Sequence, residues 1–173
     1  MSSVLKVDAI QNTGGTTGLT IDSSGRVLQP AKPAWRIGRG SSLTGVNATT
    51  TVINYDATDN ADRDLFLQGG VTASSGVVTV PVTGVYHVGT SNRFNDVSSS
   101  YIVVRIVKNN DVDSSLGSYD IVGDGQSTNY ETIGNSTLYK LTANETVKVD
   151  YYVSNDASFT IDLRAYFWGF LVG

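Results

Sequence analysis

An all-β fold is predicted for this chain by its composition, the alternation of its apolar residues and the spacing of its turns. Gly occurs 18 times and Tyr 9 times, whereas Glu occurs only at Glu131 and Glu145. Val, Thr and Tyr favour strands, and the strong helix formers Ala, Leu, Glu and Lys are sparse. From Trp35 onward, short apolar runs alternate with turn residues and give about eight strands, which is typical of a β-sandwich or jelly roll.

Residues 1–29 predict a small N-terminal β attachment segment, which is a short β-hairpin appendage to the main domain. Leu5, Val7 and Ala9 alternate with polar neighbours, which is the period of a strand. Further along, Asp22–Gly25 reads as a four-residue hairpin loop between two short strands. Strands this short cannot bury an apolar face alone. The segment therefore needs a partner surface, either identical chains or another protein.

Residues 30–34 form the predicted linker, because Pro30 and Pro33 favour an extended and stiff chain. The main domain is then 35–173, long enough to bury a core without disulfides or metals. In this domain, Tyr101–Lys108 is nearly all apolar on both faces, which predicts a central strand covered on both sides. The predicted strands are Thr51–Tyr55, Leu65–Gln68, Gly76–Val80, Val85–Phe94, Tyr101–Lys108, Asn129–Leu138, Thr146–Val153 and Phe159–Leu171.

The last predicted strand, Phe159–Leu171, is apolar on two faces. Its core face is Phe159, Ile161, Leu163, Ala165, Phe167, Gly169 and Leu171. The other face begins polar, with Thr160, Asp162 and Arg164, and then carries Tyr166, Trp168 and Phe170. The outer face of a sandwich strand is normally polar, and an aromatic stripe left in water invites aggregation.

Two interpretations of this stripe stay open. A loop of the same chain could cover it, or it could be buried against other subunits around a symmetry axis, where aromatic residues are favoured. Trp35 could join the core cluster or this outer one. We expect the second interpretation, so that Tyr166, Trp168 and Phe170 form a trimer interface.

Three segments of the main domain resemble C1q-like domains. Val77–Val88 is similar to their F-x-x-P-x-x-G-x-Y-x-F segment, Leu141–Val149 to their L-x-x-G-D-x-V-x-V turn and strand, and Trp168–Leu171 to their closing F-x-G-x-L strand. The sequence departs from that pattern at Val78, where Phe is common, and at Asn144-Glu145, which replace Gly-Asp. The resemblance covers Trp35–Gly173. It implies a ten-stranded C1q/TNF-like jelly-roll sandwich that packs as a homotrimer.

The N-terminal segment resembles the start of phage fibre-type virion proteins, through Leu5–Asn12, the Gly-Thr repeats and Gly18–Asp22. That resemblance implies a protein on the surface of a virion, assembled in the host cytoplasm. We expect a short tail fibre. Its knob, which is the main domain 35–173, binds a host surface glycan or protein, while residues 1–29 dock on other virion proteins. The alternative is a capsid decoration protein, a cement protein or head fibre that clamps shell subunits. The 34 residues before the knob favour a short attachment in either case.

Composition argues against several other classes. The net charge is −4 and only 16% of residues are charged, with Lys and Arg scattered, so no nucleic-acid surface is expected. No apolar run approaches the roughly 18 residues of a membrane span, and no signal peptide is expected. The chain has no Cys, which excludes disulfides and thiolate metal sites.

We expect no enzyme, no cofactor and no metal. His87 is the only histidine, and no G-x-S-x-G elbow accompanies it, so it is taken as a structural strand residue. Glu131 and Glu145 have no evident partner for glycan cleavage, which leaves a depolymerase as a distant third function. Two acidic groups are interpreted as hydrated loops because they lack EF-hand spacing. They are Asp56, Asp59, Asp62 and Asp64, and Asp111, Asp113, Asp120 and Asp124.

Exposed tyrosines are the remaining candidates for ligand contact. An aromatic ring on a loop or an outer face can pack against a sugar or a protein partner. Tyr101, Tyr119, Tyr130 and Tyr152 are the candidates, with ordinary strand packing as the alternative for at least half of them.

Overall fold

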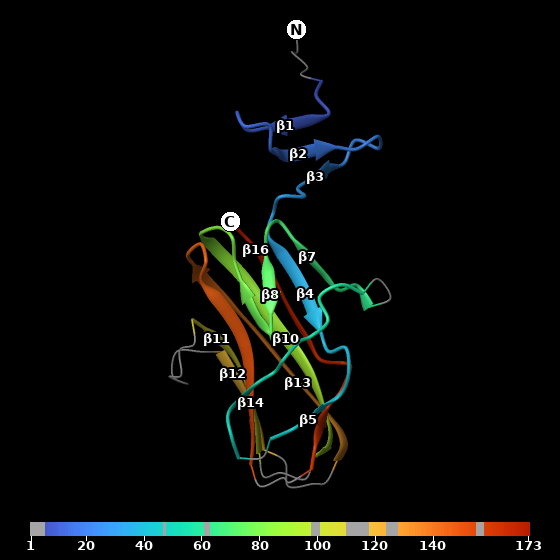
Figure 1. Ribbon diagram of the computed structural model, residues 1–173, viewed down its shortest axis with the longest axis vertical. Coiled ribbons are helices and arrows are strands. Elements are labelled where there is room, and N and C mark those ends of the chain that lie inside the picture. Colours follow the sequence, from blue (N-terminus) through green and yellow to red (C-terminus); the bar gives the residue numbers. More distant parts are fainter. Residues whose placement is uncertain are drawn as a thin grey trace.

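The protein is an all-β sandwich with a small sheet at one end, seen in a computed structural model (Figure 1). The structure describes residues 6–46, 48–60, 63–97, 101–109, 118–123, 128–154 and 158–173, of which 118–123 and 128–129 are described by their backbone alone. Within these ranges, no helix is long and apolar enough to cross a membrane. The prediction of an all-β chain is confirmed.

The N-terminal sheet contains three antiparallel strands rather than a single hairpin. These are β1 (Ala9–Gln11), β2 (Thr17–Ile21) and β3 (Val27–Leu28), in the order β1-β2-β3. Side chains fix both turns: Asn12 Oδ1 accepts hydrogen bonds from the amides of Gly14 and Thr16, and Asp22 Oδ1 accepts from those of Ser24 and Arg26. Such Asx turns need only local sequence, which explains why the 22–25 loop was predictable.

The first layer of the sandwich is a seven-stranded sheet, here called the β10 sheet. Its path runs β5-β15-β10-β16-β4-β7, and β13 pairs with the other edge of β10. The strands are β4 (Ala34–Gly38), β5 (Leu43–Thr44), β7 (Phe66–Gln68), β10 (Gly84–Val97), β13 (Thr128–Leu141), β15 (Thr160–Ile161) and β16 (Tyr166–Leu171).

The second layer is the six-stranded β11 sheet. Its path runs β12-β11-β14-β9-β8, with β6 paired to β14. The strands are β6 (Thr51–Val52), β8 (Thr72–Ser74), β9 (Val77–Thr79), β11 (Tyr101–Lys108), β12 (Ser118–Gly123) and β14 (Thr146–Val153). Sequence analysis did not identify β4, β5, β8 or β12, because each is at most six residues long and contains or adjoins Gly or Ser.

The core lies between the two sheets and is built from alternate residues. In β14, Val147, Val149, Tyr151 and Val153 are fully buried, as their alternation predicts. Trp35 packs against two aromatic rings of this core. Its ring centroid lies 5.7 Å from that of Phe167 and 6.2 Å from that of Tyr86. Trp35 therefore belongs to the inner cluster.

A buried polar network crosses this core. The Tyr55 hydroxyl donates to Asn92 Oδ1 at 2.7 Å and lies 3.0 Å from Thr90 Oγ1. Thr90 Oγ1 donates in turn to the carbonyl of Tyr166, 2.9 Å away. Burial raises the pKa of Tyr55, so the hydroxyl keeps its proton and remains a donor. The network ties the β6–β7 segment to β10 and β16.

The prediction of one continuous strand from Phe159 to Leu171 is wrong. The segment is split into β15 and β16, which both pair with β10 but leave two extra residues between them: Ile161 faces Phe94 and Tyr166 faces Ser91. At the break, Asp162 Oδ1 accepts a hydrogen bond from the Arg164 amide at 2.6 Å, which forms a turn. Leu163 is consequently 44% exposed instead of lying on the core face.

Asp162 is the second correction at this break. It is buried and accepts from Arg93 Nε at 2.6 Å, although it was assigned to a solvent-facing position. The expectation that β11 is covered on both sides is also only partly right. Val107 is buried on its outer side, but Tyr101 is 38% exposed and Val103 is half-buried, so the outer side of β11 is covered along only part of its length.

Candidate subunit interface

Tyr166, Trp168 and Phe170 all project from the outer face of the β10 sheet. They alternate with Phe167 and Gly169, which are buried on the inner face. Tyr166 and Trp168 are half-buried, and Phe170 is 41% exposed. The three residues therefore form one stripe along β16, in the middle of the sheet, with β10 on one side and β4 on the other.

Trp168 lies flat against β10 because its cross-strand neighbour there is Gly89. A Cβ at Gly89 would come within 2.1 Å of the indole ring. The indole stacks on Phe170, with centroids 6.4 Å apart and planes inclined by 15°. The His87 ring meets both aromatic rings edge-on, at 5.0 Å from Trp168 and 5.5 Å from Phe170. His87 is thus a packing partner of the stripe.

Tyr166 is covered by two arginines of the same chain. The guanidinium carbon of Arg36 lies 4.6 Å from the centre of the Tyr166 ring, and that of Arg63 lies 5.3 Å away. Arg63 is held in place by donating to the backbone carbonyls of Arg39 and Leu163. The alternative of cover by the same chain therefore applies to Tyr166, whereas Phe170 keeps much of its surface in solvent.

The apolar surface extends beyond β16 onto neighbouring strands. Leu138 of β13 stands opposite His87 and is 61% exposed, and Phe66 of β7 stands opposite Arg36 and is 42% exposed. We call the surface formed by Phe66, Leu138, Tyr166, Trp168 and Phe170 the aromatic face. Sequence analysis missed Phe66 and Leu138, because only the pairing register places them beside β16.

The remaining tyrosine candidates lie elsewhere. Tyr101 and Tyr152 stack on the outer side of the β11 sheet, with centroids 5.6 Å apart. Tyr130 is 62% exposed on β13, and the Arg93 guanidinium lies 4.4 Å from its ring centre. Tyr101, Tyr130 and Tyr152 therefore take part in packing contacts, and the side chain of Tyr119 lies outside the described residues.

The acidic loop residues act as local hydrogen-bond acceptors and ion-pair partners. Asp56 accepts from the Gly40 amide at 2.7 Å and lies 3.3 Å from Arg39 Nη1, and Asp64 lies 3.9 Å from Arg36 Nη1. In the ranges that the structure describes, no cluster of three acidic or histidine side chains is arranged to hold a metal ion. Asp62, Asp111, Asp113, Asp124 and the side chain of Asp120 fall outside those ranges.

The two glutamates differ in environment. Glu145 accepts from the Thr142 amide at 2.7 Å and lies 3.0 Å from Lys108 Nζ, and these contacts lower the pKa of its carboxyl. It thereby fixes the turn before β14. Glu131 is half-buried on β13, where it pairs with Phe94 of β10.

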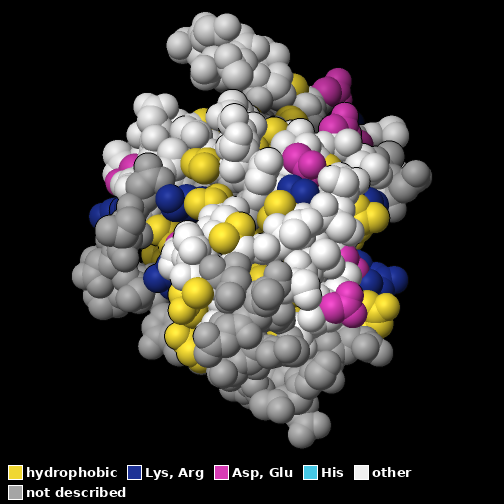
Figure 2. All heavy atoms as spheres, turned by 60° about the horizontal axis from the view of Figure 1, so that its bottom comes forward, with side chains coloured by type: hydrophobic (Ala, Val, Ile, Leu, Met, Phe, Trp, Pro, Cys, Tyr) yellow, Lys and Arg dark blue, Asp and Glu magenta, His cyan; other side chains and the backbone are white. Residues whose placement is uncertain are grey.

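Charged side chains of both signs are interspersed with hydrophobic ones on the face that Figure 2 shows. Nucleic-acid binding normally needs clustered Lys and Arg. The aromatic face is instead distinguished by its aromatic side chains. Such side chains are enriched at the buried centres of protein–protein interfaces.

No model of a known protein family matches the chain, and neither does any curated protein.

Proposed function

We propose that this chain is a non-enzymatic structural protein that assembles as a homotrimer through the aromatic face. The observation that carries the proposal is the stripe of half-buried Trp168 and 41% exposed Phe170 in the middle of a sheet. A soluble protein rarely leaves such a surface in water, and burial against another subunit removes it from solvent. Leu138 and Phe66 widen the stripe on either side.

An interface of ordinary size would fit on this chain. A specific interface buries roughly 800 Å² on each partner, which is less than a tenth of the 9531 Å² that the chain exposes. Tyr166 and Trp168 are already half-buried and Phe170 is 41% exposed, so these rings would form the centre of the interface and the strands around them would supply most of its area. Three subunits, rather than two, is what the resemblance to C1q-like domains implies.

We further propose that the trimer stands on the surface of a virus particle as a short tail fibre that binds a host glycan or protein. The resemblance of the N-terminal segment to phage fibre-type proteins supports this location. The arrangement of the chain is compatible with it, because the N-terminal sheet and the C-terminus lie at one end of the sandwich and leave the other end free (Figure 1).

Trp168→Asp tests the assembly. The wild-type chain is expected to sediment as a trimer at micromolar concentration. The variant is expected to give monomers or aggregates, because a charge would be placed in a desolvated site. Thr72→Asp, at an exposed position of the β11 sheet, is the matched control and should remain a trimer. A Trp168→Asp protein that remains a stable trimer would exclude the aromatic face as the interface.

Two measurements test the role in the virion. Purified trimer should block infection of host cells in proportion to its concentration. Failure of the trimer to bind those cells would contradict its proposed role as an adhesin. Densitometry of purified particles gives the copy number. A few trimers per particle would support a tail fibre, whereas hundreds of chains per particle would indicate a capsid decoration protein instead.

A further inference from the structure

The N-terminal sheet has one face made of aliphatic side chains. Ile10 pairs with Leu19, and Ile21 pairs with Val27. Cross-strand partners share a face, and so do residues two apart along a strand. Ile10, Leu19, Ile21 and Val27 therefore lie together, and we call them the aliphatic face. Ala9, Thr20 and Leu28 lie on the opposite face.

The aliphatic face is open in the single chain. Val27 is 61% exposed, Ile10 53% and Ile21 39%, and Leu19 is half-buried. Within β1, β2 and β3 this face has no charged side chain that would favour water. Strands of two to five residues are too short to be stable without burying such a face.

The linker places this sheet at the end of the aromatic face. The Leu171 amide donates to the Pro33 carbonyl at 2.9 Å, and Gln68 Nε2 donates to the Lys32 carbonyl at 3.0 Å. The chain that leaves the N-terminal sheet is thus bonded to β16 and β7, two strands of the β10 sheet.

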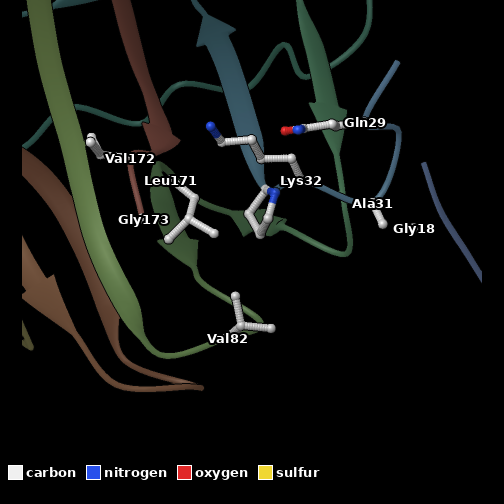
Figure 3. Close-up of a pocket in the computed structure, with 9 residues that line it drawn as sticks. Gly18, Gln29, Ala31, Lys32, Val82, Leu171, Val172 and Gly173 are labelled. Atoms are coloured by element: carbon white, nitrogen blue, oxygen red, sulfur yellow. The ribbon is translucent and has the colours of Figure 1, made fainter. Parts of the chain in front are cut away.

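A hollow of mixed polarity, with Gln29 and Lys32 among its lining residues, lies between the knob and the N-terminal sheet. It has a volume of about 500 Å³ and is lined by Val82, Leu171 and Val172 from the knob, by the linker, and by Gly18 of β2 (Figure 3). Val172, one of the residues that line it, follows Phe170 by two residues and is 51% exposed. The hollow therefore lies between the end of β16 and the N-terminal sheet.

We propose that the aliphatic face packs against the same face of two other copies, so that residues 9–28 extend the subunit interface along the trimer axis. This inference rests on the trimer proposed above. Three knobs joined through their aromatic faces would bring three identical sheets together on short linkers, at a high effective concentration. The opposite face, with Ala9, Thr20 and the 47% exposed Leu28, would then remain for contact with the virion.

Single cysteines test this packing, because the chain has no native Cys. In the full chain, Ile10→Cys and Val27→Cys each place a thiol on the aliphatic face. Ala9→Cys, one residue away on the opposite face and also exposed, is the matched control. After mild oxidation of the trimer, Ile10→Cys and Val27→Cys are expected to run as covalent dimers on a non-reducing gel, with at least tenfold more dimer than Ala9→Cys.

Hydrogen exchange gives a second readout that needs no substitution in the N-terminal sheet. The amides of Thr17–Ile21 should exchange at least tenfold more slowly in the wild-type trimer than in the Trp168→Asp monomer. Equal cross-linking from both faces, or none, in a protein that sediments as a trimer would overturn the inference and leave the proposed trimer intact. A wild-type chain that sediments as a monomer would overturn both.

Discussion

The indole of Trp168 rests on Gly89 of the adjacent strand, and a methyl group at that position would meet the ring at 2.1 Å. The same device occurs on the other side of the sheet. There, Trp35 lies against Gly169, where an added Cβ would come within 2.4 Å of its indole. Both tryptophans of the β10 sheet thus pack against a glycine on the neighbouring strand, Trp35 toward the core and Trp168 on the outer face.

We predict that Gly89→Ala weakens the trimer without unfolding the knob. The added methyl displaces the Trp168 indole from β10, and the dissociation constant should rise about tenfold, equivalent to about 1.4 kcal/mol. Sedimentation equilibrium measures the change, and Trp168 emission should shift to the red. Gly40→Ala is the control, because its nearest neighbour lies at 3.5 Å. If the emission of the variant shifts to the red but its trimer dissociation constant is unchanged, Trp168 is not part of the trimer interface.

We predict that Asp162→Ala destabilises the knob by about 1–3 kcal/mol, because it leaves the Arg93 guanidinium without its carboxylate and removes the acceptor of the Arg164 amide. Asp162→Asn keeps a side-chain oxygen for the turn but loses the charge, so its cost should be smaller. Urea unfolding monitored by circular dichroism measures both. Equal losses for the two variants would show that the turn acceptor contributes nothing.

Phe167→Ala should cost about 3–5 kcal/mol, because Phe167 is fully buried against Trp35 and Tyr55 and its removal leaves a cavity. Leu163→Ala, four residues earlier, should cost less than about 1 kcal/mol, since Leu163 is exposed at the break between β15 and β16. Thermal or urea unfolding of the two variants compares them. A large loss at Leu163 would mean that the strand continues through the break.

We predict that Glu145 stabilises the knob at neutral pH and that this contribution is lost in acid. The amide of Thr142 and the Lys108 ammonium lower the pKa of its carboxyl below the usual 4.5. Because the folded pKa is below the unfolded one, the ionised carboxyl stabilises the fold above pH 4.5, and this contribution is lost as the pH falls through the folded pKa. Glu145→Gln should therefore unfold at a lower urea concentration than the wild type at pH 7.

The two proteins should converge in acid. As the pH falls below 4.5 and then through the lower folded pKa, the wild-type carboxyl takes up its proton and loses the contribution that the glutamine lacks, so the gap between their urea midpoints should close. If the difference between the two urea midpoints stays constant from neutral pH into acid, the hydrogen-bond acceptors of the Glu145 side chain stabilise the turn and its charge does not.

Local sequence determined the strands and turns whose signals lie within a few residues. The alternation Val147, Val149, Tyr151 and Val153 predicted the buried face of β14, because side chains alternate between the two faces of any strand. The loop at Asp22–Gly25 was equally predictable, since its hydrogen bonds join residues at most four positions apart. The stripe Tyr166, Trp168 and Phe170 was visible in the sequence for the same reason.

Tertiary structure alone decided what each of these residues meets. Asp162 read as an outward residue of a continuous strand, yet its partner Arg93 lies 69 positions away and holds it inside. The pairing of β10 with β13 and β16 places Leu138, His87 and Phe170 in one row, although Leu138 reads as part of a polar strand. Alternation fixes the face on which a side chain lies, whereas its neighbours depend on strand order and register, which are set by the packing of the whole sandwich.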